Sequence, residues 1–409
     1  METDIPQEPA KHNEGSGGGS LPGLRQRPND GGVGMEEKEY MRRAIALAQQ
    51  AGGFAAPNPL VGAVIVKDGR IIGEGFHRRC GEYHAERNAL ASLTESAEGA
   101  TMYVTLEPCC HVGRTPPCTE AIIEHKIAKV YIGSRDPNPL VAGKGAQCLR
   151  EHGIDVREDF LREECDALNP IFFHYITTKT PYAALKYAMT LDGKIASYTG
   201  ASQWITGTEA RQHVQTLRGR YSAVMAGIGT VLADDPMLNC RLEGAHQPLR
   251  VVVDSRLRIP LDSRLCQTAK DCPLLVACVE ADDGKRQALE ALGVTVCVCP
   301  MKDGHVDLRY LMQLLAQRQI SSVLIEGGGQ LNEAALTADV VQHLYVYIAP
   351  KLLGGKNAKT PVEGQGADHP DHAALLQYRS MTRLGDDWLL EYDVERGVCD
   401  VHGHCGRDR

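Results

Sequence analysis

The stretch that decides the fold begins at His84-Ala85-Glu86 and resumes, twenty-two residues after Glu86, with Pro108-Cys109-Cys110-His111-Val112-Gly113-Arg114-Thr115-Pro116-Pro117-Cys118. One imidazole and two thiolates are ligands that suit Zn²⁺, and three protein ligands leave a fourth position for water. A carboxylate close to the ligating histidine can move protons between that water and a substrate nitrogen. The stretch therefore predicts a zinc-dependent deaminase, with His84, Cys109 and Cys118 as ligands of one zinc ion and Glu86 as the proton carrier.

The elements around this stretch support the same interpretation. The residues 102–106 read as a strand that ends just before Pro108, and 85–93 and 119–126 read as short helices. Each predicted helix begins beside a predicted ligand, where the N-terminal dipole stabilises a thiolate.

The spacing of the cysteines narrows the substrate class. Nucleic-acid and nucleoside deaminases of this type carry Pro-Cys-x-x-Cys, but position 112 is Val and the second thiol follows nine residues after Cys109. The longer loop carries His111 and Arg114, which suit a small anionic substrate. Cys110 is a rival ligand; Cys109 is favoured because it directly follows Pro108 at the end of the strand.

The pattern of residues 36–152 predicts a mixed sheet with helices on both faces. A helix is expected at 36–50, and a hairpin at 61–66 and 71–75 turns at Asp68-Gly69. Strand and helix then alternate through 102–106, 119–126, 130–133 and 146–152. Pro181 marks the end of a linker.

The second half also alternates, which indicates a second α/β domain. Strands are expected at 182–188, 223–226, 251–254, 274–277, 294–298, 323–326 and 344–348. The strand at 323–326 runs into Gly327-Gly328-Gly329 and a helix from about residue 331. The free N–H groups at such a junction suit a phosphate. Gly227-Ile228-Gly229 lacks the third glycine of the Rossmann fingerprint, so that fold is rejected.

Composition predicts a cytoplasmic enzyme with two domains. The chain has 409 residues and a net charge of -8, which argues against nucleic-acid or acidic-membrane partners. Its fourteen cysteines are scattered, which favours reduced thiols. We expect a disordered extension at 1–34, a deaminase domain at 35–180, a reductase domain at 181–394 and a disordered tail at 395–409. The Cys and His residues of 399–405 leave a second zinc site as the alternative for that tail.

Two sets of motifs resemble one known family. The first set is Pro57-Asn58-Pro59-Leu60-Val61-Gly62, Gly75-Phe76-His77, His84-Ala85-Glu86, the cysteine loop and Asp136-Pro137-Asn138-Pro139. The second is Thr190-Leu191-Asp192-Gly193-Lys194, Ser202-Gln203-Trp204-Ile205-Thr206 and Thr230-Val231-Leu232-Ala233-Asp234-Asp235-Pro236. Over residues 36–394 the chain resembles the bifunctional riboflavin-biosynthesis deaminase/reductases. The resemblance implies an α/β chain with a cytidine-deaminase-like domain, a dihydrofolate-reductase-like domain, zinc and NADPH.

The resemblance also implies roles for individual residues. Positions around the pyrimidine and ribose phosphate of the deaminase substrate are Asn58, His77, His111, Arg114, Asp136 and Asn138. For Asn58 and Asn138 the alternative is turn chemistry beside proline. Cofactor positions are Ala188, Trp204, Thr230, Asp234, Ser255, Gly328, Gly329, Gln330, Leu331, Asn332, Glu333 and Ala334. Substrate positions of the reductase are Ser202, Arg218, Leu238, Arg241 and Glu326, of which the two arginines suit a phosphate.

The implied chemistry has two steps on one chain. Hydrolytic deamination converts a diaminopyrimidinone ribosyl phosphate to the uracil, and hydride from NADPH then opens the ribosyl group to a ribityl chain, giving an amino(phosphoribitylamino)uracil. The general acid of the second step cannot be named from the sequence. The alternatives are a nucleoside or tRNA deaminase with an unrelated C-terminal domain, and a non-catalytic interaction protein. The sequence leaves open whether the chain forms a homo-oligomer.

Overall fold

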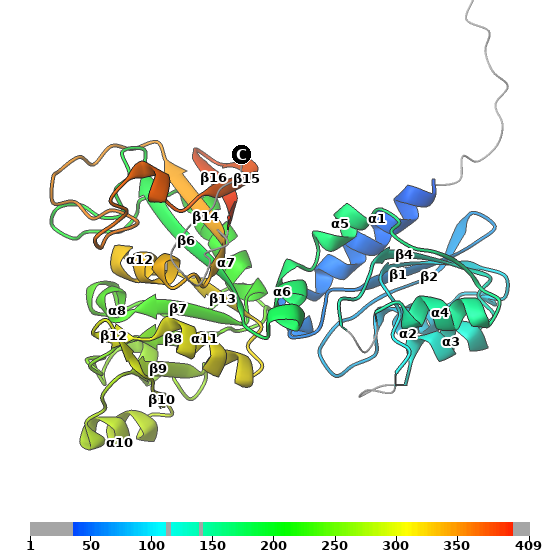
Figure 1. Ribbon diagram of the computed structural model, residues 1–409, viewed down its shortest axis with the longest axis horizontal. Helices are drawn as coiled ribbons and strands as arrows, with labels where there is room; N and C mark the ends of the chain where they lie inside the picture. The colour runs from blue at the N-terminus through cyan, green and yellow to red at the C-terminus, as the bar shows by residue number, and fades with distance from the viewer. Residues whose placement is uncertain (1–35, 112–115, 139–141, 396–409) are drawn as a thin grey trace, which may run out of the picture. The chain divides into compact units, whose positions relative to one another are not determined.

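The computed structural model describes residues 36–111, 116–138 and 142–395 (Figure 1). The predicted N-terminal extension, the substrate residue Arg114 and the Cys/His tail at 399–405 all lie outside the described residues.

The N-terminal half is built on a five-stranded sheet with the order β2-β1-β3-β4-β5. Strand β1 pairs antiparallel with β2 and β3, whereas β3, β4 and β5 run parallel. The strands are β1 (Gly62–Lys67), β2 (Arg70–Phe76), β3 (Thr101–Leu106), β4 (Lys129–Ser134) and β5 (Asp155–Arg157). The sheet is mixed, as the sequence predicts.

Helices cover both faces of this sheet, which Figure 1 shows with α1 and α5 on one side and α2, α3 and α4 on the other. The bounds are α1 (Glu37–Ala48), the 3-10 turn η1 (Gln49–Ala55), α2 (Ala85–Ala91), α3 (Cys118–Glu124), α4 (Lys144–Glu151) and α5 (Arg162–Asp166). Val64 belongs to the core under α1, and its neighbour Ile65 belongs to the core under α2, α3 and α4. Because side chains alternate along a strand, a strand covered on both faces is apolar throughout.

The predicted linker before Pro181 contains a helix, α6 (Pro170–Thr178). Pro170 occupies its first turn, where a proline costs no hydrogen bond. This helix was not predicted, because Asn-Pro at 169–170 is typical of a turn.

The C-terminal half contains a nine-stranded sheet with the order β10-β9-β8-β7-β13-β6-β14-β16-β15. The strands from β10 to β14 are parallel neighbours, and β16 and β15 add antiparallel at one edge. The strands are β6 (Tyr182–Thr190), β7 (Ala223–Gly227), β8 (Leu249–Val253), β9 (Leu274–Cys278), β10 (Thr295–Val298), β13 (Ser322–Ile325), β14 (Val341–Ala349), β15 (Leu376–Leu384) and β16 (Asp387–Val394), beside the small pair β11 (Met301–Lys302) and β12 (His305–Val306).

Apolar side chains fill both faces of the parallel part of this sheet, in two separate clusters. The helices are α7 (Thr208–Arg220), α8 (Ile228–Asp234), α9 (Arg264–Gln267), α10 (Asp283–Ala291), α11 (Leu308–Gln317), α12 (Gly329–Thr337) and the 3-10 turn η2 (Pro370–His372). All seven strands that the sequence predicts are present. In the part of the chain that the structure describes, no helix is both long and apolar enough to cross a membrane.

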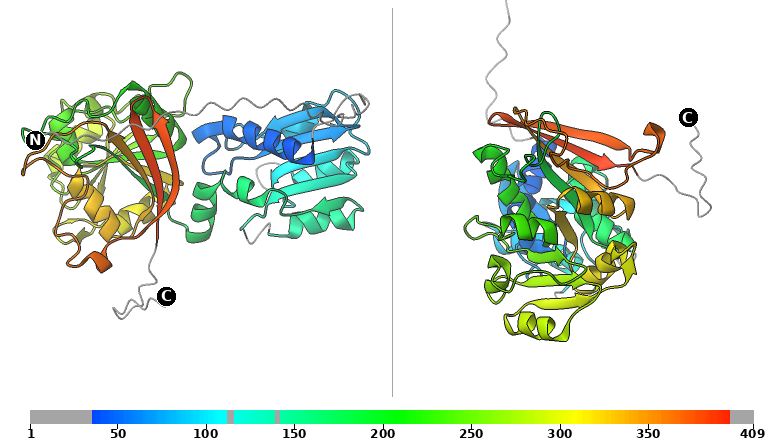
Figure 2. Two further views of the ribbon diagram at one scale, coloured as in Figure 1. Left: turned by 90° about the horizontal axis from the view of Figure 1, so that it is seen from above. Right: turned by 90° about the vertical axis from the view of Figure 1, so that its left-hand side faces the viewer.

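The long antiparallel pair β15 and β16, drawn in orange and red in Figure 2, was not predicted. Strand β15 lies at the edge of the sheet, and its side chains are mostly exposed. An edge strand without a buried face has no need of the period-two pattern that reveals a strand in a sequence.

A buried histidine joins the last strands of the sheet. His343 on β14 lies opposite Asp393 on β16, with Nδ1 2.7 Å from Asp393 Oδ1 and Nε2 3.3 Å from Glu391 Oε2. Carboxylates only accept hydrogen bonds, so both ring nitrogens must carry a proton. Burial lowers the pKa of His343, but the bonds to Asp393 and Glu391 outweigh it and raise that pKa above its usual value.

We expect the free energy of unfolding to depend on pH through His343. Because its pKa is raised in the folded state, the stabilisation is complete below the unfolded pKa of about 6.5 and disappears as the pH rises through the folded pKa. In thermal unfolding, the difference in free energy of unfolding between the parent and His343→Gln should be largest at low pH and should shrink as the pH rises. The matched control is His372→Gln, which removes an exposed imidazole bonded to Asp368. A constant difference between parent and His343→Gln at every pH would contradict the assignment.

Candidate active site

The three predicted zinc ligands meet at the ends of three elements. His84 is the N-cap of α2, Cys118 is the first residue of α3, and Cys109 follows β3. The Nδ1 atom of His84 lies 3.5 Å from Cys109 Sγ and 3.4 Å from Cys118 Sγ, and all three ligand atoms lie within 4.8 Å of one another. Cys110 is outside this cluster.

The chemistry of these donors fits a zinc ion. One nitrogen and two sulfur atoms face a common point at distances that tetrahedral ligands adopt around one metal. The pKa of Cys109 falls to about 4, because the Cys118 thiol and then His84 bond to its sulfur. The backbone N–H of Cys118 also donates to Cys109 Sγ at 3.4 Å. These contacts favour the thiolate form of Cys109, which is the form that binds a metal.

Glu86 lies beside the cluster in the first turn of α2 and is only 3% exposed. Burial raises the pKa of its carboxyl, and the positive charge of His84 opposes that rise. A carboxyl whose pKa is shifted towards neutrality can both take and return a proton.

A cavity of about 430 Å³ opens onto the cluster. Its lining includes His84, Glu86 and Cys109, together with every predicted substrate residue of this half that the structure describes: Asn58, His77, His111, Asp136 and Asn138. The structure thus gathers residues that lie up to eighty positions apart in the sequence, between Asn58 and Asn138.

His77 and Asn58 hold one another in the wall of this cavity. His77 Nδ1 lies 3.1 Å from the carbonyl oxygen of Tyr83, so this nitrogen carries the proton, and His77 Nε2 accepts from Asn58 Nδ2 at 3.1 Å. Burial lowers the pKa of His77, which keeps the ring neutral. The Asn58 amide donates to a histidine across the cavity wall, which argues against a purely local turn role.

Asp136 follows β4 and is almost fully buried. Its Oδ1 accepts from the backbone N–H of Asn138 at 2.8 Å, so part of the turn chemistry predicted here belongs to Asp136. Burial raises the pKa of Asp136 to about 6. The Asp136 carboxylate is therefore more basic than usual and is suited to accept a hydrogen bond from an amino group.

In the C-terminal half, two glycine-rich junctions lie at the same edge of the sheet. Gly227 is the N-cap of α8 after β7, and Gly328 is the N-cap of α12 after β13. Strands β7 and β13 are parallel neighbours, so both helix N-termini point free N–H groups to one side. This edge suits the pyrophosphate of a dinucleotide.

The predicted cofactor residues differ in what they can offer. Asp234 Oδ1 accepts a hydrogen bond from the predicted substrate residue Ser202 at 2.9 Å. The Trp204 ring is 62% exposed, with the Arg211 guanidinium 4.8 Å from its centre. The Leu331 and Asn332 side chains are instead buried, and Asn332 Nδ2 donates to the carbonyl of Pro361. Those two positions can reach a cofactor only through their backbone.

The remaining predicted cofactor positions lie around the same edge of the sheet. Thr230 is in the first turn of α8, Ala188 lies near the end of β6, and Ser255 follows β8. Ser255 Oγ accepts from the backbone N–H of Val306, so its hydroxyl hydrogen remains available for a ligand.

The predicted substrate residues Arg218 and Glu326 form a buried ion pair. Arg218 Nε and Nη2 donate to the two Glu326 oxygens at 2.6 and 3.0 Å, and Nη1 donates to the carbonyl of Asn239. The pKa of Glu326 is about 2, because Arg218 and Lys186 outweigh the effect of burial. Each nitrogen of this guanidinium has one partner, but Nη1 and Nη2 each keep a second N–H, so the phosphate contacts of Arg218 and of the exposed Arg241 both stay predictions.

Lys186 is the functional candidate that the sequence analysis missed. It is partly buried on β6, its Nζ lies 3.6 Å from Glu326 Oε2, and desolvation lowers its pKa. The available signal was a single lysine inside the apolar run 182–189. Leu238, by contrast, was predicted to contact substrate, but its side chain belongs to the core and could contribute only backbone atoms.

A His-Cys-Cys cluster beside a buried glutamate is the arrangement of a zinc-dependent deaminase. The sheet edge with two glycine-rich helix starts suits a dinucleotide cofactor. Family models agree: residues 35–134 match the cytidine and deoxycytidylate deaminase zinc-binding region, and 181–390 match the RibD C-terminal domain. The chain belongs to the RibD family of riboflavin-biosynthesis proteins.

Individual relatives match over almost the whole chain. The riboflavin biosynthesis protein RibD of Actinobacillus pleuropneumoniae is 56% identical, covering 88% of this chain and 96% of the relative. The Escherichia coli RibD is 41% identical over 87% and 99% of the two chains. Among solved structures, Acinetobacter baumannii RibD is 39% identical with a TM-score of 0.77 and covers 88% of this chain and 98% of its own.

A further solved structure is that of a relative named for two activities. The diaminohydroxyphosphoribosylaminopyrimidine deaminase/5-amino-6-(5-phosphoribosylamino)uracil reductase of Thermotoga maritima is 38% identical with a TM-score of 0.78, covering 87% of this chain and 98% of its own. The chain is thus a bifunctional enzyme of riboflavin biosynthesis that uses zinc and NADPH and acts on a small molecule. The alternatives of a nucleoside or tRNA deaminase with an unrelated appendage, and of a non-catalytic protein, are rejected because both halves match one family in one order.

Proposed function

We propose that the deaminase half hydrolyses the ring amino group of a diaminopyrimidinone ribosyl phosphate, and that the reductase half then reduces the ribosyl group of the product. The observation that carries this proposal is the cavity in which the His84, Cys109 and Cys118 cluster meets Glu86 and Asp136. The description of the Thermotoga relative names both activities on such substrates. We place the deaminase domain at 35–180 and the reductase domain at 181–394.

In the first reaction, the protein residues bind the ring and move protons. His84, Cys109 and Cys118 would hold a zinc ion, which would lower the pKa of a bound water molecule. Glu86 takes one proton from the attacking water and gives it to the ring nitrogen. It then takes the second proton from the new hydroxyl group and gives it to the amine, which leaves as ammonia. Asn58, His77, His111, Asp136 and Asn138 contact the substrate from the cavity wall, and Arg114 is assigned to its phosphate.

In the second reaction, the protein mainly positions substrate and cofactor, since hydride chemistry belongs to NADPH. The N-termini of α8 and α12 bind the cofactor, with Ala188, Trp204, Thr230, Asp234 and Ser255 around it and the backbone of Gly328 to Ala334 on its phosphates. The residues that contact the sugar phosphate are Ser202, Arg241 and the ion pair of Arg218 with Glu326. Lys186 is the ammonium group of this cluster, and it can donate the proton that the opened sugar oxygen requires.

The direct test is incubation of the protein with the diaminopyrimidinone ribosyl phosphate, followed by mass spectrometry. Without NADPH, the deaminated and unreduced compound should accumulate with release of ammonia. With NADPH, the mass should rise by two further hydrogens. A product that is reduced but still carries the amino group would contradict the order of the steps.

Removing Arg241 should stall the second reaction. A charge-assisted bond contributes about 1.5–3 kcal/mol, so Arg241→Ala should raise the KM of the reductase about tenfold to 150-fold. The deaminated intermediate should then accumulate in the coupled assay. The matched control is Arg286→Ala, which removes an exposed arginine bonded to Glu290 on α10. If both variants have the same reductase KM, Arg241 does not contact the substrate.

We also propose that the protein acts in the cytoplasm as a cofactor-dependent enzyme without nucleic-acid or membrane partners. Cys278 on β9 and Cys297 on the adjacent β10 are buried free thiols, which suit a reducing compartment. The net charge of -8 opposes binding to nucleic acid.

A further inference from the structure

One buried carboxylate in the wall of the deaminase cavity has no part in the chemistry described above. Glu107 lies at the end of β3, two residues before Cys109, and is only 5% exposed. Its own N–H donates to the carbonyl of Ser134, which ties β3 to the end of β4. A buried charge is costly unless it is bonded, so its partners indicate what it does.

The Glu107 carboxylate accepts three backbone N–H groups at the start of α4. Oε1 accepts from Gly145 at 3.0 Å and Ala146 at 3.2 Å, and Oε2 accepts from Gly143 at 3.0 Å. The helix start also packs tightly on the neighbouring residue, since a Cβ on Gly145 would lie 2.0 Å from the carbonyl oxygen of Pro108. The charged acceptor and the close packing together fix where α4 begins.

From Gly143, a continuous series of bonds leads to the cavity. The neighbouring Ala142 donates its N–H to the carbonyl of Asn138 at 2.9 Å, and the N–H of Asn138 donates to Asp136 Oδ1 at 2.8 Å. Asp136 and Asn138 line the cavity beside the predicted zinc ligands. A shift of the Gly143 N–H would therefore be passed to the Asp136 carboxylate.

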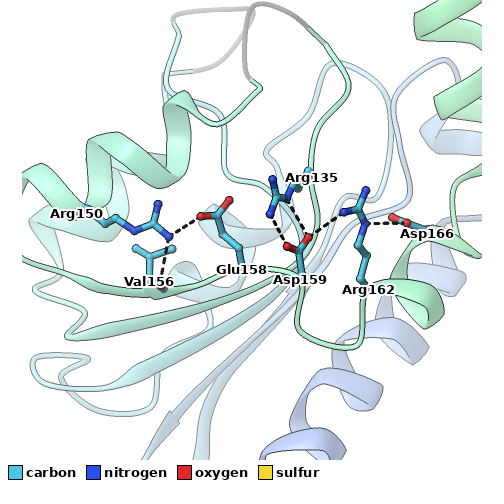
Figure 3. A network of polar contacts seen from close by, with 7 residues as sticks. All are labelled: Arg135, Arg150, Val156, Glu158, Asp159, Arg162 and Asp166. Carbon is cyan, nitrogen blue, oxygen red and sulfur yellow. Dashed lines mark hydrogen bonds and ion pairs between the residues drawn. The ribbon is translucent and has the colours of Figure 1, made fainter.

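On the other side of Asp136, the chain is held by ion pairs on the surface. Arg135, which directly precedes Asp136, bonds to both oxygens of Asp159, with Nε to Oδ1 at 2.9 Å (Figure 3). Arg162 donates to the same Asp159 at 3.1 Å and to Asp166 at 3.2 Å. The chain is thus held on the surface just before Asp136 and by Glu107 in the interior at Gly143.

We propose that Glu107 is a positioning residue for substrate binding in the deaminase half, acting through Gly143, Ala142 and Asn138 on Asp136. This inference rests on the proposed role of Asp136 in contacting the substrate. The three-bond pattern requires a carboxylate, because an amide would turn its NH₂ group towards at least one of the backbone donors. Glu107→Gln therefore breaks the Gly143 link, or else the two bonds to Gly145 and Ala146.

The test measures KM and kcat of deamination in Glu107→Gln, Asp136→Asn and the double variant. Glu107→Gln should raise KM about tenfold, because a small misplacement of a binding group is costly, and kcat should change less than about threefold. The double variant should have the KM of Asp136→Asn alone, since the two residues act in series. Bound zinc and reductase activity on the deaminated substrate should equal those of the parent.

A second variant reaches the same link from the other side, should Glu107→Gln fail to fold. Gly143 has a φ of +76° and open space around its Cβ position, so Gly143→Ala strains the backbone without a clash. It should also raise KM. The matched control is Gly153→Ala at the opposite end of α4, with a φ of +80° and equal open space. This control should keep the KM of the parent.

The outcomes separate this inference from the proposed function. If Asp136→Asn leaves KM unchanged, the substrate role of Asp136 fails and the inference fails with it. If Asp136→Asn raises KM but Glu107→Gln does not, Glu107 is purely structural. Additive effects in the double variant, or loss of zinc from Glu107→Gln, would also overturn the inference.

Discussion

Glu86→Gln should lower the rate of deamination by about two to four orders of magnitude while zinc stays bound. The carboxyl is buried beside the cluster, and its raised pKa suits a group that takes and returns a proton. The amide has nearly the same shape but cannot carry a proton between water and the ring nitrogen. The experiment compares ammonia release with metal content in the purified variant.

The two halves of the chain provide an internal control for that result. Glu86→Gln should reduce the pre-deaminated substrate at the parent rate, because Glu86 lies in the N-terminal domain and the proposed cofactor residues follow Pro181. The exposed Glu120→Gln, on α3, is a matched control that should leave both activities unchanged. Deamination near the parent rate in Glu86→Gln would eliminate its role as proton carrier.

Removal of either predicted thiolate ligand should abolish deamination altogether. Cys109→Ala and Cys118→Ala each leave two protein ligands, which is too few for a tightly held catalytic zinc ion. Metal analysis should find about one zinc ion per chain in the parent and far less in both variants. The reductase reaction on the deaminated substrate should continue.

Cys110→Ala is the control for the cysteine variants, because Cys110 directly follows Cys109 yet lies outside the ligand cluster. It should keep zinc and both activities. Loss of zinc from Cys110→Ala together with its retention in Cys109→Ala would reverse the assignment of the ligand.

The alternation of apolar runs was enough to predict the parallel strands of the C-terminal sheet and β1 to β4 of the N-terminal sheet, whereas the short parallel strand β5 was missed. Strands such as β3 and β13 are buried on both faces, so their sequences are mostly apolar and lack a polar face. The edge strand β15 was not predicted because it has no buried face, and the helix α6 was not predicted because it begins with a proline. Local pattern predicts an element only where burial imposes that pattern.

By itself, the sequence determined the deaminase chemistry, because a zinc site needs particular donor atoms and short motifs carry them at the ends of elements. His84, Glu86, Cys109 and Cys118 could therefore be predicted from residue type and spacing alone. Only the tertiary structure decided which groups are free to act. Arg218 is engaged by Glu326, 108 positions away, Lys186 joins them from another strand, and Glu107 holds a helix start that follows it by more than thirty residues. Such pairings depend on how distant strands and helices pack, and no local feature of the sequence records that packing.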